Sequence, residues 1–268
     1  MPELPEVETV VRTLEYRIKG RRITDVDIKM PKIIEGDPEV FAETLKGQSF
    51  REFGRRGKYL LFYMDDCVLV SHLRMEGKYY IQKPDEPFDR HVHVIFRLDD
   101  GTELRYHDTR QFGRMSVVSK DQDFSGWHSL GPEPFDDRLT AEYIYRTAKY
   151  RNTPLKTLLL DQSFIAGIGN IYADEILASC HLRPGRNCRR ITRADAENIR
   201  VNTVRIMREA IACGGTTIRS YTSSLGVTGM FQTECTVHMQ KRCPVCGSEI
   251  KVKRIGGRSS YYCPACQK

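Results

Sequence analysis

The chain has 268 residues, of which 40% are hydrophobic and 29% charged, and a formal net charge of +7 at pH 7. This length allows two modest domains, and the composition is that of a globular protein, not a disordered or fibrous one. No stretch approaches the roughly 18 consecutive apolar residues that a membrane helix needs, so no membrane partner is expected. The first residues are acidic and interrupted by prolines, so we expect no signal peptide.

The positive charge is concentrated near the C-terminal end. Residues 241–268 contain seven Lys or Arg residues and one Glu, so they carry six of the seven net positive charges. A short basic module on a nearly neutral body is typical of a protein that contacts a phosphate backbone. A solvated basic tail is the alternative, and composition alone does not decide between the two.

Four of the nine cysteines are arranged as two C-x-x-C pairs separated by sixteen residues. An odd number of cysteines without an export signal indicates a reducing cytoplasm, where paired cysteines usually hold a metal. The spacing predicts one zinc ion with the ligands Cys243, Cys246, Cys263 and Cys266. Four protein ligands leave no open position, so the zinc is expected to be structural. A redox dithiol, the alternative, would need only one pair.

The first half of the chain predicts a two-layer β-sandwich with two helices. Apolar residues at helical spacing predict a helix over 7–18, and Asp37, Pro38 and Gly47 mark the start and end of a second helix. Apolar runs and alternation predict strands at 59–64, 68–73, 92–98, 103–107 and 114–118. We therefore expect an N-terminal domain over residues 1–130.

The second half predicts helices. Glycine and prolines within 130–134 break the periodicity and predict a linker over 131–139. Helical segments are expected to begin at Thr140, Leu155, Asn170 and Thr192. Residues 216–240 show little periodicity, which predicts a long functional loop. The expected domains are a helical one over 140–240 and a cysteine module over 241–268.

The chain begins Met1-Pro2-Glu3-Leu4-Pro5-Glu6. Helix capping explains the later prolines and acids but gives no reason for Pro2 and Glu3. Removal of Met1 would leave Pro2 as a free secondary amine, and an α-amine has a pKa near 8, well below that of lysine. Such an amine can attack the anomeric carbon of a sugar, and Glu3 can act beside it as acid and base.

The start PELPEVET, the segments GRRGKY, HLRMEG, DTRQFG and GIGNIY, and the cysteine module resemble formamidopyrimidine-DNA glycosylases in order and nearly from end to end. The resemblance implies an α+β fold: an N-terminal β-sandwich, a helical helix-two-turns-helix domain and a β-hairpin zinc finger. It also implies a bifunctional DNA glycosylase and abasic-site lyase that removes 8-oxoguanine and formamidopyrimidines from duplex DNA. A sister branch that acts on oxidised pyrimidines typically begins PEGPE, so Leu4 favours the purine branch.

The resemblance assigns the catalytic roles. Pro2 displaces the damaged base and holds the sugar as a Schiff base, after which both flanking phosphates are eliminated, and Glu3 is the adjacent acid. Lys58 is a catalytic lysine beside the sugar, whereas on position alone it could be an edge-strand lysine that prevents aggregation. Glu6 supports the site from the first helical turn. The family's phosphate-binding arginine falls on Arg258, at the expected hairpin tip.

Further residues are expected to hold the DNA. The resemblance places Met75, Arg110 and Phe112 in the gap left by the extruded base, a place that apolar or planar side chains fill. By residue type alone, Met75 and Phe112 would be core residues and Arg110 a surface charge. His72 is expected to contact a phosphate, although a lone histidine is more often structural. Asn170 is expected to bind the phosphate next to the lesion, where a glycine turn opens a helix.

The lesion-recognition loop is expected within 216–221 and its continuation, with Thr217, Arg219 and Tyr221 as candidate contacts. The run Val237-His238-Met239-Gln240-Lys241-Arg242 is shorter than the Tyr-Gly-Arg-like segment of relatives and lacks its glycine. His91 and His93 could suggest a metal, but without a third ligand nearby we interpret them as a structural pair.

The expected partner is double-stranded DNA that contains oxidised purines or abasic sites, bound by a monomer in the cytoplasm, at the nucleoid. No nucleotide cofactor is expected, because the stretch 167–172 has a tyrosine where a dinucleotide fingerprint needs its third glycine. A non-catalytic protein that binds damaged DNA is the alternative from another class. This alternative is disfavoured by the presence of Pro2, Glu3 and Lys58, because a protein that only binds DNA does not need these three residues.

Overall fold

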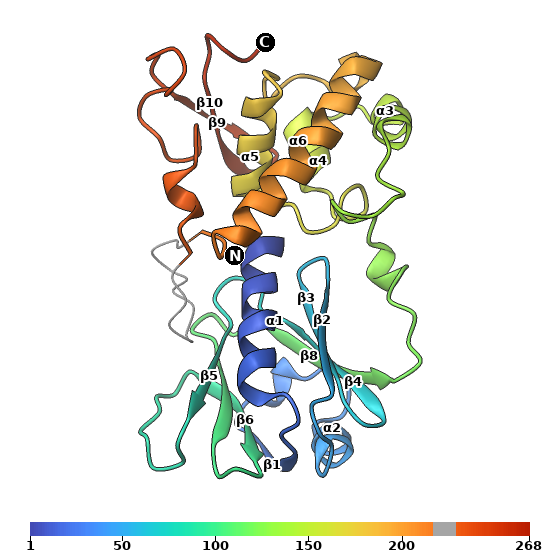
Figure 1. The fold of residues 1–268 in the computed structure, drawn as a ribbon, viewed down its shortest axis with the longest axis vertical. Coiled ribbons are helices and arrows are strands. Elements are labelled where there is room, and N and C mark those ends of the chain that lie inside the picture. The colour runs from blue at the N-terminus through green and yellow to red at the C-terminus, as the bar shows by residue number, and fades with distance from the viewer. Residues whose placement is uncertain (217–228) are drawn as a thin grey trace. The chain divides into compact units, whose positions relative to one another are not determined.

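The computed structural model describes residues 1–216 and 229–268. The chain divides into two compact units, one formed by Met1–Phe124 with Thr216–Gly229 and the other by Ser125–Gly215 with Met230–Lys268 (Figure 1). Among the described residues, no helix combines the length and the apolar character that crossing a bilayer requires.

The first unit is built on two four-stranded antiparallel sheets. One has the strand order β1 (Ile23–Ile28), β6 (Val92–Leu98), β7 (Glu103–His107) and β5 (Lys78–Gln82). The other has the order β2 (Glu52–Arg56), β3 (Tyr59–Tyr63), β4 (Cys67–His72) and β8 (Arg114–Ser119). The expected two-layer sandwich is confirmed.

The sequence patterns missed three strands, β1, β2 and β5, and all three lie at sheet edges. Most of their residues are only half-buried or exposed. An edge strand pairs on one side only and tolerates polar residues on both faces, so its apolar alternation is weak. The apolar pattern of the sequence therefore predicted mainly the strands that pair with another strand on both sides.

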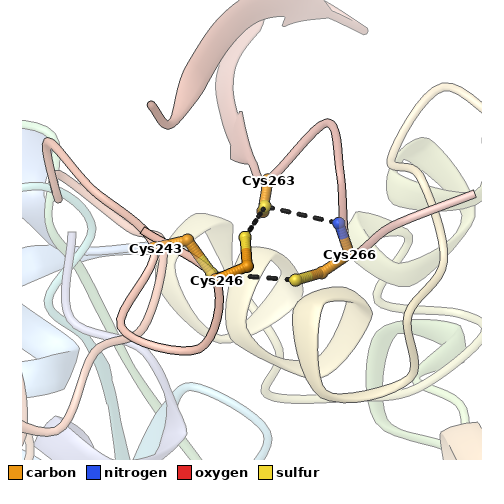
Figure 2. Close-up of side chains that lie close together, drawn as sticks. All are labelled: Cys243, Cys246, Cys263 and Cys266. Carbon is orange, nitrogen blue, oxygen red and sulfur yellow. Dashed lines mark hydrogen bonds between the residues drawn. The ribbon is translucent and has the colours of Figure 1, made fainter. Parts of the chain in front are cut away.

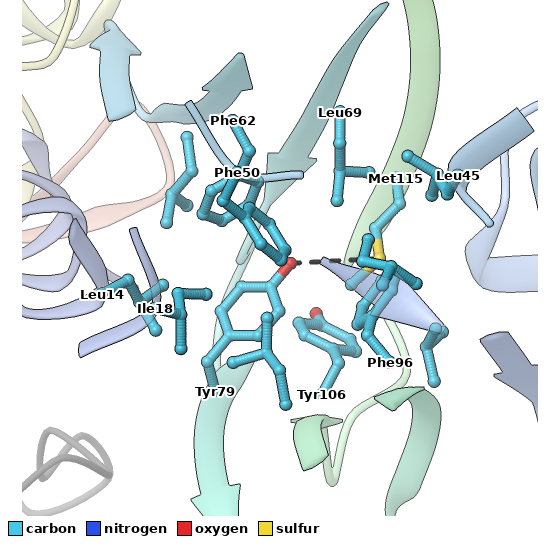
Figure 3. Packing of buried hydrophobic residues seen from close by; sticks show 14 of the residues in the cluster. Leu14, Ile18, Leu45, Phe50, Phe62, Leu69, Tyr79, Phe96, Tyr106 and Met115 are labelled. Atoms are coloured by element: carbon cyan, nitrogen blue, oxygen red, sulfur yellow. Dashed lines mark hydrogen bonds between the residues drawn. The ribbon is translucent and has the colours of Figure 1, made fainter. Parts of the chain in front are cut away.

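Two helices complete the core of the sandwich. Helix α1 (Leu4–Ile18) packs against β2 and β3, and α2 (Pro38–Leu45) packs against the edge strands β1 and β8. Leu14 and Ile18 of α1 join the same buried cluster as Phe62 of one sheet and Phe96 of the other (Figure 3). Because α1 is anchored in both layers, the chain start is attached to the rigid core of this unit.

Tyr106 of β7 supports two loops that leave the sheets. Its side chain is fully buried, and a Cβ atom at either Gly77 or Gly113 would overlap its hydroxyl group. Gly77 closes the loop after β4, and Gly113 closes the loop before β8. Both loops therefore pack on the same hydroxyl because each has a glycine at the point of approach.

The second unit contains four α-helices and a hairpin. The helices are α3 (Ala141–Tyr150), α4 (Leu155–Leu160), α5 (Asn170–Ser179) and α6 (Arg193–Ala212), with 3-10 turns at Trp127–Ser129, Cys188–Arg190 and Phe231–Thr233. Helix α6 begins with a capping box in which the Thr192 hydroxyl accepts from the Asp195 amide and the Asp195 carboxylate accepts from the Thr192 amide. All four helices begin within a residue of the positions expected from the sequence.

The hairpin consists of β9 (Lys251–Ile255) and β10 (Arg258–Tyr262). Gly256 and Gly257 form its two-residue turn with φ values of 55° and 77°. A two-residue hairpin turn with positive φ at both positions matches the right-handed twist of the strands and strongly favours glycine. This turn places Arg258 at the hairpin tip, as expected.

Replacing Gly113 by alanine tests the support from Tyr106. The added methyl group has no room beside the buried hydroxyl, so we expect Gly113→Ala to lower the free energy of unfolding by about 1–3 kcal/mol, measured by chemical denaturation. Gly126→Ala is the control, because no heavy atom lies within 4 Å of its Cβ position. Equal stabilities for the two variants would contradict the packing described for Tyr106.

Candidate functional site

The chain start lies among several charged side chains of the first unit. Pro2 and Glu3 are buried, and the amino group described by the structure is that of Met1. Burial lowers the pKa of this amino group below its usual value near 8. The nearby positive charge of Lys58 lowers it further, whereas negative charges, chiefly those of Glu3 and Glu6, oppose the shift. An amine placed here holds its proton less tightly than a solvated one.

Glu6 connects the chain start to the beginning of the loop expected to recognise the lesion. Its buried carboxylate accepts a hydrogen bond from the Glu3 amide at 2.8 Å. The other oxygen accepts from the Thr216 amide at 2.7 Å and from the Thr216 hydroxyl at 3.0 Å. Thr217, Arg219 and Tyr221, the candidate lesion contacts, lie outside the described residues.

Lys58 stands at the turn between β2 and β3. Only 5% of it is exposed, which counts against a solvated lysine that guards a sheet edge. The turn is shaped by Arg55, whose guanidinium donates to the Gly57 carbonyl at 3.0 Å and to the Glu8 carboxylate of α1 at 3.1 Å. Glu8 and Arg55 were not singled out from the sequence, because an ion pair between α1 and β2 has no local signature.

Arg110 and Phe112 project from the loop between β7 and β8. Phe112 is 49% exposed, and the Arg110 guanidinium lies 4.9 Å from the centre of its ring. A large exposed aromatic ring next to an exposed arginine is unusual for core packing and suits a side chain that stacks on a base. Met75, on the neighbouring loop, is half-buried.

Asp108 organises the loop of Arg110 and Phe112. Its fully buried carboxylate accepts hydrogen bonds from the amides of Arg110, Phe112 and Gly113 at 2.8–3.0 Å. Gln111 then adopts a φ of 58°, which turns the chain between the two projecting side chains. An aspartate followed by a turn is a recognisable sequence signal for such a loop.

A hydrogen bond from the Thr109 hydroxyl to the Glu76 carboxylate joins the two projecting loops. Arg74, just before Met75, has a φ of 52°. Its amide donates to Nδ1 of His72 at 2.9 Å, and the His72 ring packs edge-to-face on Tyr59. His72 therefore has a structural contact through Nδ1.

The pair His91 and His93 has structural contacts. Nε2 of His93 lies 2.8 Å from the Asp108 carbonyl, and the His91 ring lies 5.6 Å from the ring of His107. Within the described parts of the chain, the four cysteines form the one cluster of potential metal ligands.

The four cysteine sulfurs of the second unit converge (Figure 2). All four lie within 4.8 Å of one another, and the Cys243–Cys266 and Cys246–Cys263 pairs are 3.9 and 3.5 Å apart. A tetrahedral zinc site with Zn–S bonds of about 2.3 Å needs sulfurs about 3.8 Å apart. The donor set therefore fits zinc, with every coordination position filled by protein.

The second unit also contains the two residues expected to bind phosphate. Asn170 is the first residue of α5 and is half-buried, so its side chain stands among the free amides of a helix N-terminus. Arg258 is exposed at the hairpin tip. The side chain of Gln267 links the hairpin module to the helices, since it accepts from the Cys263 amide and donates to the Leu182 carbonyl, both at 2.8 Å.

Three family models match consecutive parts of the chain. The N-terminal domain of formamidopyrimidine-DNA glycosylase matches residues 1–115, its H2TH domain matches residues 130–222, and a zinc finger found in FPG and IleRS matches residues 240–268. These three matches cover most of the chain, so the sequence resemblance is not confined to one motif.

Relatives and solved structures match the chain over its whole length. Formamidopyrimidine-DNA glycosylases of Bacillus licheniformis and Oceanobacillus iheyensis are 46% and 44% identical, covering 100% of this chain and 100% and 98% of theirs. A complex of Lactococcus lactis Fpg with DNA that contains an abasic site is 35% identical, with a TM-score of 0.94 and 99% of each chain covered. A complex of the same protein with DNA that contains N7-benzyl-Fapy-dG has the same identity and TM-score and full coverage.

Replacing one zinc ligand tests the metal site. We expect Cys246→Ser to reduce bound zinc from one per chain to near zero, because three thiolates no longer close the tetrahedron. Hydrogen exchange should then accelerate in residues 241–268 and stay slow in residues 1–124. Cys213→Ser, which changes a cysteine outside the cluster, should keep one zinc. A variant Cys246→Ser with full zinc content would disprove this ligand set.

Proposed function

This chain belongs to the formamidopyrimidine-DNA glycosylase family and is a DNA glycosylase and abasic-site lyase that acts on oxidised purines, and we propose that its nucleophile is the Pro2 amine. The supporting observation is the lowered pKa of the amino group at the chain start, which follows from its burial and from Lys58. Removal of Met1 exposes the Pro2 nitrogen, which is otherwise a tertiary amide without a nucleophilic lone pair.

In the proposed reaction, the Pro2 nitrogen attacks C1′ of the damaged nucleotide while the bond from C1′ to the base breaks. The proton of the nitrogen passes to the departing base, Glu3 protonates the ring oxygen as the sugar ring opens, and an iminium ion forms between Pro2 and C1′. Loss of a proton from C2′ then expels the 3′ phosphate, and a second elimination expels the 5′ phosphate. Water finally hydrolyses the Schiff base and frees Pro2.

Glu3 and Lys58 are the proposed partners of Pro2. Glu3 is buried next to the nucleophile in sequence, where its carboxyl group can give a proton to the sugar ring oxygen and take one later. Lys58 is buried as well, and its charge acts on the amino group from within the same unit. We assign Lys58 two effects: it lowers the pKa of the amine and stabilises negative charge that develops on the sugar and phosphate.

The remaining site residues are proposed to hold extruded DNA. Met75, Arg110 and Phe112 enter the gap in the duplex. The Asp108 carboxylate fixes the loop that carries Arg110 and Phe112. His72, Asn170 and Arg258 contact phosphates. The structural zinc holds the hairpin that presents Arg258 and takes no part in the chemistry.

Glu6 is proposed to couple lesion recognition to catalysis. Its carboxylate fixes Thr216, where the recognition loop begins, and the Glu3 amide at the same time. A change in the loop is thereby transmitted to the chain start. Thr217, Arg219 and Tyr221 remain candidate contacts to the base. We also place the enzyme in the cytoplasm with the nucleoid, since a reducing compartment keeps the thiolate ligands available.

Borohydride trapping tests the nucleophile. Reduction of the iminium ion should link the protein covalently to DNA that contains 8-oxoguanine or an abasic site, and peptide mass spectrometry should find the sugar on Pro2. We expect Pro2→Gly to lose base excision and most trapping. The intact mass shows whether Met1 is absent from the active protein. Equal trapping and excision by the two proteins, or an adduct on another side chain, would refute the assignment.

The substrate class is tested separately. The identity of Leu4 favours the purine branch. Because its side chain is fully buried, Leu4 indicates the branch but is not a contact to the base. Duplexes with 8-oxoguanine and with thymine glycol should be cleaved at clearly different rates, the purine faster. A preference for thymine glycol would indicate the pyrimidine branch with the same chemistry. A protein that binds abasic DNA and never nicks it would instead be a binding protein only.

The pH dependence of trapping tests the pKa of the amine. The trapping rate should rise with pH as the amine loses its proton. Because the charge of Lys58 lowers the pKa of the amine, Lys58→Met should move the rising limb to higher pH, in addition to reducing the rate. Glu76 raises that pKa, so Glu76→Gln should move the limb to lower pH.

Lys19→Met is the control for this pH profile, because Lys19 is exposed at the other end of α1. It should leave the profile unchanged. Identical midpoints in the Lys58→Met and wild-type profiles would show that the charge of Lys58 does not act on the nucleophile.

A further inference from the structure

A buried chain of polar side chains connects His238 to the strand that carries Arg258, within the second unit. Nδ1 of His238 lies 2.8 Å from one oxygen of Asp174. The other oxygen of Asp174 lies 2.6 Å from Nζ of Lys156, which also donates to the Ser259 carbonyl at 3.0 Å. The side chains of Lys156 and Asp174 are fully buried. Ser259 directly follows Arg258 in β10.

His238 belongs to the run that departs from the pattern of relatives. The structure shows how this run is held: the buried carboxylate of Glu175 accepts from the amide and hydroxyl of Thr236 and from the amides of Val237 and His238, at 2.7–3.0 Å. Met239 then has a φ of 59°, in the left-handed region that favours glycine. The turn is therefore kept although the glycine is absent, and it points the His238 ring at Asp174.

The hairpin of Arg258 contacts this network at three points. The Ser259 carbonyl accepts from Lys156, and the Tyr261 ring lies 4.8 Å from the His238 ring. At the hairpin tip, a Cβ atom on Gly256 would lie 2.8 Å from the hydroxyl of Thr157, the neighbour of Lys156 on α4. The backbone on both sides of Arg258 is thus tied to the helices.

The same carboxylate belongs to the helix that begins at Asn170. Asp174 lies four residues after Asn170 in α5, so the two share one face of the helix. A fully buried Lys–Asp pair adds less to stability than apolar side chains of equal volume would, because both ions lose their hydration. Such a pair instead fixes the orientation of the elements that it joins relative to one another, which here are α4, α5 and β10.

We propose that His238 is a positioning residue, which acts through Asp174 and Lys156 to hold Arg258 at the correct place relative to Asn170 for binding phosphates of the DNA backbone. A carboxylate can only accept, so Nδ1 of His238 donates and fixes the rotamer of Asp174. The inference rests on the proposed function, since it takes Arg258 as a phosphate ligand. It adds a residue that the family motifs do not supply.

A double-mutant cycle on DNA binding tests the proposal. The probe is a duplex with a tetrahydrofuran abasic analogue, and its affinity is measured over a series of salt concentrations. His238→Phe keeps a ring against Tyr261 and loses the donor, whereas His238→Asn keeps a donor near the position of Nδ1. Each His238 variant is made twice, once in the protein that keeps Arg258 and once together with Arg258→Ala. Glu209→Gln, which breaks an exposed ion pair on α6, is the matched control.

We expect His238→Phe to weaken binding about 3- to 10-fold when Arg258 is present and to have no effect in the Arg258→Ala background. The slope of log affinity against log salt should fall in magnitude by up to about 0.9, the value for one phosphate contact. His238→Asn should restore most of the affinity and the slope, and Glu209→Gln should match the wild type.

Equal weakening by His238→Phe with and without Arg258, no weakening at all, or loss of zinc would overturn the proposal and leave His238 a purely structural residue. Unchanged binding by Arg258→Ala alone would refute the phosphate role of Arg258, and the inference with it. That result would leave the nucleophile untouched, because trapping at Pro2 is measured independently.

Discussion

Buried carboxylates that accept several backbone N–H groups shape the functional loops of this protein. Glu6 fixes Glu3 and Thr216, Asp108 fixes the loop of Arg110 and Phe112, and Glu175 fixes the run before the first cysteine pair. A loop has backbone donors without a ladder partner, and a buried carboxylate is unstable without donors. Each of these hydrogen-bonded groups gives the loop amides an acceptor and gives the buried carboxylate its donors. The result is a backbone of irregular path whose amides are held by a buried acceptor.

The two units differ in how much apolar core supports their candidate functional residues. In the first unit, burial and the charge of Lys58 lower the pKa of the amino group at the chain start, and the burial comes from an extensive apolar core around α1. In the hairpin of the second unit, by contrast, most residues of β9 and the first residues of β10 are exposed. Its apolar cluster contains few residues, among them Val237 and Ile250. Four metal–thiolate bonds replace the missing core, which explains why a structural zinc accompanies the basic module.

Much of the fold follows from local patterns. The spacing of the cysteine pairs predicted the metal site, the Gly256-Gly257 turn predicted the hairpin tip, and Thr192 and Asp195 predicted the start of α6. The turn, the helix start and each C-x-x-C pair lie within a few residues of chain, and the spacing between the two pairs is itself a known metal-site signal, so residue type and spacing suffice. The edge strands were missed because they pair on one side only and tolerate polar residues on both faces, which weakens the apolar alternation. Likewise, the sequence marked His238 only as a departure from the family pattern.

The sequence alone established that this protein has a β-sandwich, a helical part and a zinc hairpin, and it made Pro2 the candidate nucleophile. These features could be predicted because motif spacing and periodicity are properties of residues that are close together in the chain. Tertiary structure alone decided which charges surround the chain start, that Glu6 reaches residue 216, and that His238 is linked to the strand of Arg258. Those contacts join residues far apart in the chain. Their formation depends on how the core packs, and packing leaves no local mark in the sequence.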